Sequence, residues 1–386
     1  MASFPNKLNK KLEERVSNNA LRSLRIANNL IDFSSNDYLG FAHNSNIFEN
    51  TSRMLADKKS EQNGATGSRL ISGNHSLYLE VENIISDFHK AESALVFNSG
   101  YDANIGFFSA VPQRGDVIFY DEYIHASIRD GIALSAAKGY KFKHNDLNNL
   151  KKVMNRVSAT AIESSEVQVY VVTESIFSMD GDTPDLKLFA EYCDKSHCHL
   201  IVDEAHAIGV FGENGEGLIT ELQLEHLVFA RIITFGKAMG CHGAAILGSQ
   251  RLKDYLVNFA RSFIYTTGLP PHSLATINAA YHQLSLNDSQ LQLQLNISYF
   301  NAQLEALDLT SVFIPSHSAI HCCLISGNEK AKGVALQLHN RGFDVRAILS
   351  PTVPKGQERL RFCIHSYNTK EELKNVLSAL KILMTK

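Results

Sequence analysis

Lys237 lies in the segment TFGKAMG, between small residues and directly after a short apolar run. A lysine in such a setting is poorly solvated, which lowers its pKa and makes its amine available for Schiff-base chemistry. Thr234, three residues earlier, could contact a phosphate group. Most lysines lie on protein surfaces, so this segment alone also allows a plain surface lysine.

A second segment, DEAH, begins at Asp203 directly after the apolar run LIV. A carboxylate held at a strand end can pair with a cationic ring nitrogen and keep it protonated. His206 could donate to a neighbouring ligand oxygen. A solvated loop with two acids is the alternative interpretation, and acidic pairs after strands also occur in nucleotide and metal sites.

Two further features resemble parts of a ligand site. Gly100 and Tyr101 follow Asn98-Ser99 between an apolar run and a helical pattern, so their amides could form an anion cup at a helix N-terminus. An ordinary strand–helix turn is the more frequent outcome of such a segment. His125, in YIHAS, could stack on an aromatic ring or be a simple turn residue.

Short apolar runs alternate with helical patterns through the middle of the chain, and polar residues follow most of the runs. Continuous runs of this kind predict a mostly parallel sheet covered on both faces, with ligands at the edge where the strands end. The runs are ALVF (94–97), VIFY (117–120), VYVVT (169–173), LIV (200–202), RIIT (231–234) and AAIL (244–247).

The predicted organisation is α/β with three parts. We expect an N-terminal arm over residues 1–45, a large α/β domain over 46–270 and a smaller C-terminal α+β domain over 271–386. The Gly-Leu-Pro-Pro segment at 268–271 suggests the second boundary, and strands at 320–325 and 360–364 with helices at 330–341 and 370–384 characterise the last part.

Composition narrows the class of protein. The chain has 386 residues, 44% hydrophobic and 20% charged, with a net charge of −3, which excludes disordered, collagen-like and coiled-coil proteins. No basic stripe supports nucleic-acid binding, and no apolar stretch is long enough to span a bilayer. The polar, Lys-rich beginning lacks a signal-peptide pattern, so we expect a cytoplasmic protein without a membrane partner.

The six cysteines and 16 histidines show no metal-binding spacing. The cysteines form no CxxC pair, and the histidines form no HExxH motif. We therefore predict reduced, mostly buried thiols and no metal ion.

Taken together, the four features fit one ligand, pyridoxal 5′-phosphate (PLP). This cofactor needs an amine for its aldehyde, an acid for its ring nitrogen, an amide cup for its phosphate and a flat group over its ring. The order of cup, acid and lysine along a parallel-sheet pattern is far less frequent by chance than any single feature.

Longer segments of the chain resemble the α-oxoamine synthases, which are fold-type-I PLP-dependent transferases. The resemblance covers nearly the whole chain. Its segments are FSSNDYLG (33–40), GATGSRLISGN (64–74), TESIFSMDGD (173–182), VDEAHAIGVFG (202–212), TFGKAMGCHGAAILGS (234–249), FIYTTGLPP (263–271) and PTVPKGQERLR (351–361). Between Arg22 and Phe33 the chain is shorter than the family pattern.

The resemblance implies a role for each matching residue. Lys237 would bond the aldehyde, Asp203 the pyridinium nitrogen and His206 the phenolic oxygen, while His125 would stack on the ring and steer proton transfer. Gly100, Tyr101 and Thr234 would hold the phosphate, helped by Thr266 or Thr267 from the other subunit of a homodimer, and Ser178 would also contact the cofactor. Arg361 would clamp the amino-acid carboxylate near Asn36, and Arg22 and Thr352 would face the acyl substrate.

The family condenses an amino acid with an acyl thioester and releases CO2. GAAILGS, FIYTT-LPP and SPTVP most resemble the branch that joins L-alanine to a pimeloyl thioester, giving 8-amino-7-oxononanoate in biotin biosynthesis. Whether coenzyme A or an acyl carrier protein carries the pimeloyl group is left open. The alternatives are a sister branch of the 2-amino-3-ketobutyrate CoA ligase, 5-aminolevulinate synthase or serine palmitoyltransferase type, a catalytically silent paralogue, and a simple aminotransferase.

Overall fold

The computed structural model describes residues 4–24, 29–161, 167–286 and 288–384. The chain divides into two compact units: unit 1 comprises Met1–Ser35, Met179–Asp182 and Leu293–Lys386, and unit 2 comprises Asn36–Ser178 and Thr183–Gln292. In the described part of the chain, no helix is both long and apolar enough to cross a membrane.

Unit 2 contains a seven-stranded sheet with the order β2-β8-β7-β6-β5-β3-β4. The strands are β2 (Ser93–Phe97), β3 (Val117–Asp121), β4 (Lys138–Phe142), β5 (Val169–Glu174), β6 (His199–Asp203), β7 (Ala230–Thr234) and β8 (Ala244–Gly248). β8 is antiparallel to both of its neighbours, so the other six strands run in one direction. The predicted mostly parallel sheet is confirmed, and the six apolar runs each lie in one of its strands.

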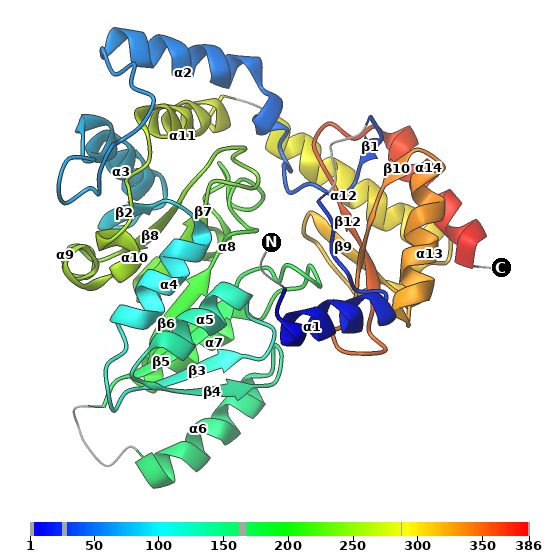
Figure 1. The fold of residues 1–386 in the computed structure, drawn as a ribbon, viewed down its shortest axis with the longest axis horizontal. Coiled ribbons are helices and arrows are strands. Elements are labelled where there is room, and N and C mark those ends of the chain that lie inside the picture. Colours follow the sequence, from blue (N-terminus) through cyan, green and yellow to red (C-terminus); the bar gives the residue numbers. More distant parts are fainter. Residues whose placement is uncertain (1–3, 25–28, 162–166, 287, 385–386) are drawn as a thin grey trace. The chain divides into compact units, whose positions relative to one another are not determined.

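The helices of unit 2 pack on its sheet or on one another. They are α2 (Ser45–Asp57), α3 (Ser76–Phe88), α4 (Gly100–Ala110), α5 (Ala126–Leu134), α6 (Leu147–Ala161), α7 (Leu186–Lys195), α8 (Leu218–Glu221), α9 (Gln250–Phe259), α10 (Arg261–Ile264) and α11 (Pro271–Leu284). α4 and α5 lie side by side along the sheet (Figure 1), and a buried apolar cluster joins them and α9 to β2, β3, β5 to β8. Burial of strands on both faces explains their continuous apolar runs.

Unit 1 is a smaller α+β unit. A three-stranded antiparallel sheet has the order β11 (Arg346–Ile348), β12 (Arg359–Cys363), β9 (Ile320–Leu324), and β1 (Ile31–Asp32) pairs with β10 (Phe343–Asp344). Its helices are α1 (Asn6–Ser17), α13 (Asn328–His339) and α14 (Lys370–Met384), together with most of α12 (Ser289–Ala306).

The limits of the units differ from the division expected at residues 45 and 270. α11 packs on α2 and α3 and therefore belongs to unit 2. The first strand of unit 1, β1, comes from the segment expected to be an arm, because Ile31 and Asp32 pair with Phe343 and Asp344. The division into functional domains at 45 and 270 stays a prediction.

Candidate active site

A cavity of about 190 Å3 lies at the edge of the sheet where β5, β6 and β7 end. Seven of the residues singled out in the sequence line it, and they come from separate strand ends and helix starts. They are Gly100, Tyr101, His125, Asp203, His206, Thr234 and Lys237. Asn104, Ser127 and Glu174, which sequence reasoning did not single out, line it as well.

Lys237 lies in the loop that follows β7, and its Nζ is 2.8 Å from Nε2 of His206. The loop turns at Gly240, whose φ of 61° favours glycine and whose N–H donates to the carbonyl of Lys237 at 2.8 Å. A Cβ at this position would meet the backbone of Ala42 at 2.2 Å. Glycine is therefore required where the lysine loop passes the segment that follows Tyr38.

The two acids at the end of β6 have different partners. Asp203 is 6% exposed and accepts hydrogen bonds from Nδ2 of Asn104 and from the N–H of Ala205, while the Glu204 side chain is fully buried. Glu204 pairs with Arg231, with Oε2 2.6 Å from Nε, and its Oε1 accepts from the N–H of Ile219. Asp203 is thus the acid that lines the cavity, and Glu204 anchors the loop.

A hydrogen-bonded chain orients His125. Asn104 donates from Nδ2 both to Asp203 Oδ2 at 3.1 Å and to Ser127 Oγ at 3.0 Å. Ser127 Oγ is 2.7 Å from Nδ1 of His125, and the Ser127 N–H also donates to that nitrogen. Nδ1 therefore accepts, which leaves the hydrogen of the neutral ring on Nε2. Burial lowers the pKa of His125, with Lys237 and Arg129 adding to the effect and Asp203 opposing it.

Glu174 lies opposite Asp203 in the register of β5 and β6. Its carboxyl is buried, and Oε1 accepts the backbone N–H of His125 at 2.5 Å. Burial raises the pKa of Glu174 well above its usual range, and the neighbouring Asp203 raises it further. Burial therefore favours the neutral form of this carboxyl.

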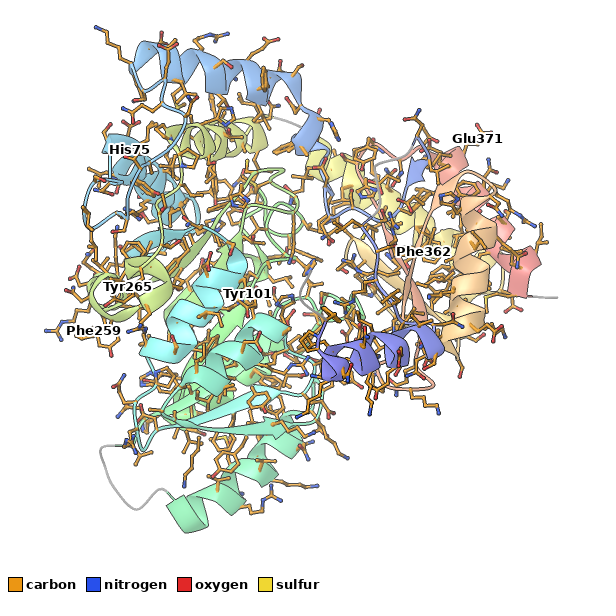
Figure 2. All side chains as sticks on the ribbon, viewed as in Figure 1. His75, Tyr101, Phe259, Tyr265, Phe362 and Glu371 are labelled. Atoms are coloured by element: carbon orange, nitrogen blue, oxygen red, sulfur yellow. The ribbon has the colours of Figure 1, made fainter. Side chains whose placement is uncertain are left out.

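The N-terminus of α4 forms the predicted anion cup. Ser99 caps the helix by accepting the N–H of Asp102, and the first amides of a helix have no acceptor within it. A Cβ on Gly100 would lie 3.7 Å from Thr234, so the glycine keeps the space beside the threonine open. Tyr101 is half exposed at the beginning of α4 (Figure 2), and its hydroxyl donates to Asp130 at 2.7 Å. Its backbone amide is thus the group available to a phosphate.

Four other predicted residues of unit 2 are not among the lining residues of this cavity in the described chain: Asn36, Ser178, Thr266 and Thr267. Asn36 accepts from the hydroxyl of Tyr38 at 3.2 Å. Thr266 and Thr267 accept from Nδ2 of Asn98, through Oγ1 and the backbone carbonyl respectively. Their predicted role requires a second subunit.

Unit 1 holds three of the four predicted substrate-binding residues. Arg22 donates from Nη2 to Oγ1 of Thr352 at 3.4 Å, which brings these two residues together. Arg361 and Arg359 lie two residues apart on β12 and share a face of the strand, but Arg359 is committed to Asp180 through Nη1. Arg361 is 9% exposed. It, rather than Arg359, is therefore the arginine of β12 that we expect to bind a substrate carboxylate.

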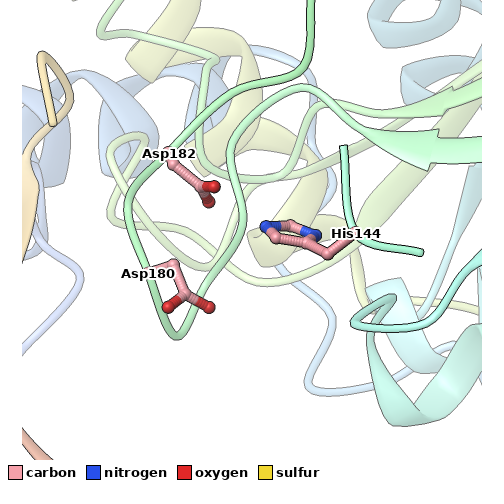
Figure 3. Close-up of side chains that lie close together, drawn as sticks. All are labelled: His144, Asp180 and Asp182. Carbon is pink, nitrogen blue, oxygen red and sulfur yellow. The ribbon is translucent and has the colours of Figure 1, made fainter. Parts of the chain in front are cut away.

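Figure 3 shows Asp180 and Asp182 projecting from the short segment that joins unit 1. Asp180 is the partner of Arg359 within that unit. His144, also drawn there, belongs to unit 2, where its Nδ1 is 2.9 Å from Oδ1 of Asp121. None of the six cysteines, all of which lie in the described chain, forms a disulfide, and five of them are buried.

Sequence reasoning missed Asn104, Ser127, Glu174 and Tyr38. Glu174 could have been identified from the sequence, because it ends an apolar run just as Asp203 does. The sequence feature of Asn104 is weaker: it is a polar residue on the buried face of α4, one turn after Gly100. Ser127 has no such feature beyond its distance of two residues from His125.

Comparison with known proteins gives a consistent result. The family model "Aminotransferase class I and II" matches residues 28–380. An 8-amino-7-oxononanoate synthase of Emericella nidulans is 41% identical over 364 residues, which covers 91% of this chain and 88% of that protein.

Solved structures share the fold. An 8-amino-7-oxononanoate synthase from Francisella tularensis matches with a TM-score of 0.75 and 29% identity, covering 92% of this chain and 98% of that chain. A serine palmitoyltransferase from S. paucimobilis, solved with bound PLP, matches with a TM-score of 0.87 and 25% identity over 98% of this chain and 97% of that chain. The fold is that of the fold-type-I PLP-dependent transferases.

The donor set of the cavity fits PLP. It offers an amine, a carboxylate held by two donors, a neutral imidazole and the free amides of a helix N-terminus. Oδ1 of Asn104 is buried without a hydrogen bond in the described chain, as expected where a polar ligand belongs. The chain belongs to the class I and II aminotransferase family and, within it, to the α-oxoamine synthase group of its 8-amino-7-oxononanoate synthase relatives.

Proposed function

We propose that this protein is a PLP-dependent acyltransferase that condenses L-alanine with a pimeloyl thioester. The products are 8-amino-7-oxononanoate, CO2 and a free thiol, a step of biotin biosynthesis. One observation carries the proposal: the Lys237 amine lies 2.8 Å from His206 in the cavity that also contains Asp203 and the start of α4. The name of the 41% identical relative supports this branch.

PLP supplies an aldehyde for the substrate amine and an electron-withdrawing ring that stabilises negative charge at the amino-acid α-carbon. Lys237 would hold the aldehyde carbon, and Asp203 would hold the proton on the ring nitrogen. His206 would donate to the phenolic oxygen, and Ser178 would add a contact. Gly100 and Tyr101 would bind the phosphate through their amides, with Thr234 beside them.

Proton transfer falls to the chain's own bases. Lys237 Nζ would take the proton from the α-carbon of alanine, which requires the neutral amine. His125 stays neutral because burial lowers its pKa, so its ring can stack on the cofactor without adding a second cation. The chain from Asp203 through Asn104 and Ser127 fixes the orientation of this ring.

Four residues would recognise the substrates, and three of them belong to unit 1. Arg361 would bind the alanine carboxylate through its planar guanidinium, with Asn36 near the same group. Arg22 and Thr352, which bond each other, would face the acyl chain, and Arg22 could pair with its distal carboxylate. The thioester carrier is coenzyme A or an acyl carrier protein.

A homodimer is the proposed assembly, with Thr266 or Thr267 reaching the partner's phosphate site. Exposed apolar side chains near these threonines support it: Ile71 is 87% exposed and Tyr265 is 73% exposed. The N–H of Gly268 bonds the carbonyl of Gly67, so both segments belong to one surface. Figure 2 shows Tyr265 at the periphery of unit 2. Six unpaired cysteines support a cytoplasmic location.

Thiol release by the PLP-loaded protein tests the proposal. Alanine, glycine and serine are each combined with pimeloyl-, acetyl-, succinyl- and palmitoyl-CoA, and a pimeloyl-carrier protein is added as a further donor. Release with alanine and a pimeloyl donor supports the proposed reaction. Release with another pair assigns the protein to a sister branch, and no release with any pair contradicts the proposal. Native turnover by Lys237→Ala would refute the role of the lysine.

A further inference from the structure

Asn98 joins the phosphate cup to the segment that carries two of the predicted cofactor residues. It stands between Phe97, which ends β2, and Ser99, which caps α4. Its Nδ2 lies 3.1 Å from Oγ1 of Thr266 and 2.7 Å from the backbone carbonyl of Thr267. One side chain therefore connects the start of the cup with both threonines.

The carbonyl of Thr267 fixes the directions of these hydrogen bonds. A carbonyl oxygen only accepts, so the NH2 group of Asn98, and not its oxygen, must face it. The same nitrogen cannot accept a hydrogen from Thr266, so it donates to that hydroxyl as well. The hydrogen of the Thr266 hydroxyl consequently points away from Asn98, and no residue of the described chain accepts it.

The two threonines differ in how their hydroxyls are held. Thr266 is half-buried and its hydroxyl oxygen is fixed by Asn98, whereas Thr267 is exposed and is held through its backbone. A donor that is already oriented loses less conformational entropy when it binds an anion. A hydroxyl that accepts one hydrogen bond is also polarised to donate a stronger one. Thr266 is therefore the better phosphate donor of the two.

The backbone on either side of Thr266 is held by contacts that do not involve Asn98. Before it, Ser262 donates from Oγ to a backbone carbonyl of α4 at 2.6 Å. After it, the N–H of Leu269 donates to the buried hydroxyl of Tyr78 at 2.6 Å. Loss of the Asn98 bonds should thus let the Thr266 hydroxyl rotate while the segment stays folded.

We propose that Asn98 is a positioning residue that directs the hydroxyl of Thr266 toward the PLP phosphate held by the partner subunit. The same side chain joins two cofactor sites, because it precedes the phosphate cup of its own subunit and holds the hydroxyl that serves the other. The proposal rests on the homodimer of the proposed function, but not on its reaction.

PLP titration of Asn98→Ala, Thr266→Val and the double variant tests whether Asn98 acts through Thr266. Binding is followed by the absorbance of PLP bonded to Lys237. Each single variant is expected to bind PLP about tenfold more weakly, the value of one hydrogen bond to a charged group. If the asparagine acts through the threonine, the double variant also loses about tenfold, whereas two independent residues would lose about a hundredfold. The 31P NMR signal of the bound phosphate should shift equally in all three variants.

Gln113→Ala is the matched control. Gln113 is also a side-chain amide that donates to two backbone carbonyls, but it follows the opposite end of α4. This variant should lose stability in urea while its affinity for PLP and its 31P signal stay as in the wild type. If Asn98→Ala does not fold, Asn98→Ser replaces it, because one hydroxyl hydrogen cannot serve both acceptors.

Heterodimers of differently tagged subunits show on which subunit Asn98 acts. One subunit carries Lys237→Ala, so that PLP is bonded only by the lysine of the other. Asn98→Ala in the subunit without the lysine is expected to weaken PLP binding at the other subunit about tenfold. The same substitution in the subunit with the lysine should leave this binding nearly unchanged.

A loss of about a hundredfold in the double variant would overturn the proposal, because the two residues would then act independently. A larger effect of Asn98→Ala on its own subunit, or a greater loss from Thr267→Val than from Thr266→Val, would overturn it as well. A PLP-bound monomer in sedimentation velocity would refute the proposed homodimer together with this inference. The expected affinities combined with no thiol release would refute only the proposed reaction.

Discussion

Replacing Glu204 by leucine should destabilise the protein strongly, because the buried guanidinium of Arg231 then has no carboxylate to balance its charge. Glu204 is fully buried, Arg231 is 4% exposed, and their closest N–O distance is 2.6 Å. Removing one member of a buried ion pair leaves an uncompensated charge and costs about 3–5 kcal/mol. Arg231→Met should cost a similar amount, since the buried carboxylate of Glu204 then has no cation to balance its charge.

The double variant Glu204→Leu/Arg231→Met should be destabilised by clearly less than the sum of the two single variants. Both charges are gone, and the remaining cost is the loss of the bonds that Arg231 donates to His89, Glu216 and Thr220 and of the bond that Glu204 accepts from the N–H of Ile219. At about 1 kcal/mol for each of these four bonds, the double variant should lose about 4 kcal/mol.

Urea unfolding of the cofactor-free protein measures these losses by circular dichroism. The control is Glu80→Gln, which breaks the exposed pair with Lys58 and should cost less than about 1 kcal/mol. A double variant destabilised by the sum of the two single variants would refute the reasoning, because it would show that the charges do not depend on each other.

Three other outcomes are expected. Gly100→Ala should leave urea unfolding nearly unchanged, because the new Cβ lies 3.7 Å from Thr234, but should weaken PLP binding in a titration by about tenfold, the value of one charge-assisted hydrogen bond. Asn104→Ala should weaken PLP binding by about three- to tenfold, since Asp203 loses an orienting donor; unchanged affinity would contradict this role. Burial lowers the pKa of His321 from 6.5 to about 3, so the unfolded chain binds its proton first and stability falls as pH drops below 6.5. His321→Leu should therefore remove about 2 kcal/mol of the stability lost between pH 6.5 and 5, as measured by urea unfolding at both values.

The sheet could be predicted where its strands are buried on both faces. The run 200–202 became β6 and the run 231–234 became β7, each with one or two residues added at the ends. β4 was missed because it is an edge strand whose residues, KGYKF, are mostly exposed and polar. The hydrophobic pattern of a segment reflects which of its residues are buried, and few residues of an edge strand are buried.

The acid, the lysine and the glycine of the cavity could be predicted, because each lies at the end of a buried strand or three residues after it. The hydrogen bonds that orient them could not. Asn104 meets Asp203 only after α4 packs across the sheet, and Tyr38 meets His206 across a long stretch of chain. Contacts of this kind leave no local pattern, since neither partner is near the other in sequence.

The position of β8 has a consequence for the synthesis of the chain. Among the described strands, β2 pairs with β8 alone, with Ser93 opposite Gly248. We therefore expect the start of α4 to reach the end of β7 only after Gly248 has left the ribosome. Closing so large a loop is slow, and the nascent strand β2 must wait with an unpaired edge. We therefore expect PLP to bind only after β8 has been synthesised. PLP binding can then report when the nascent chain completes its sheet.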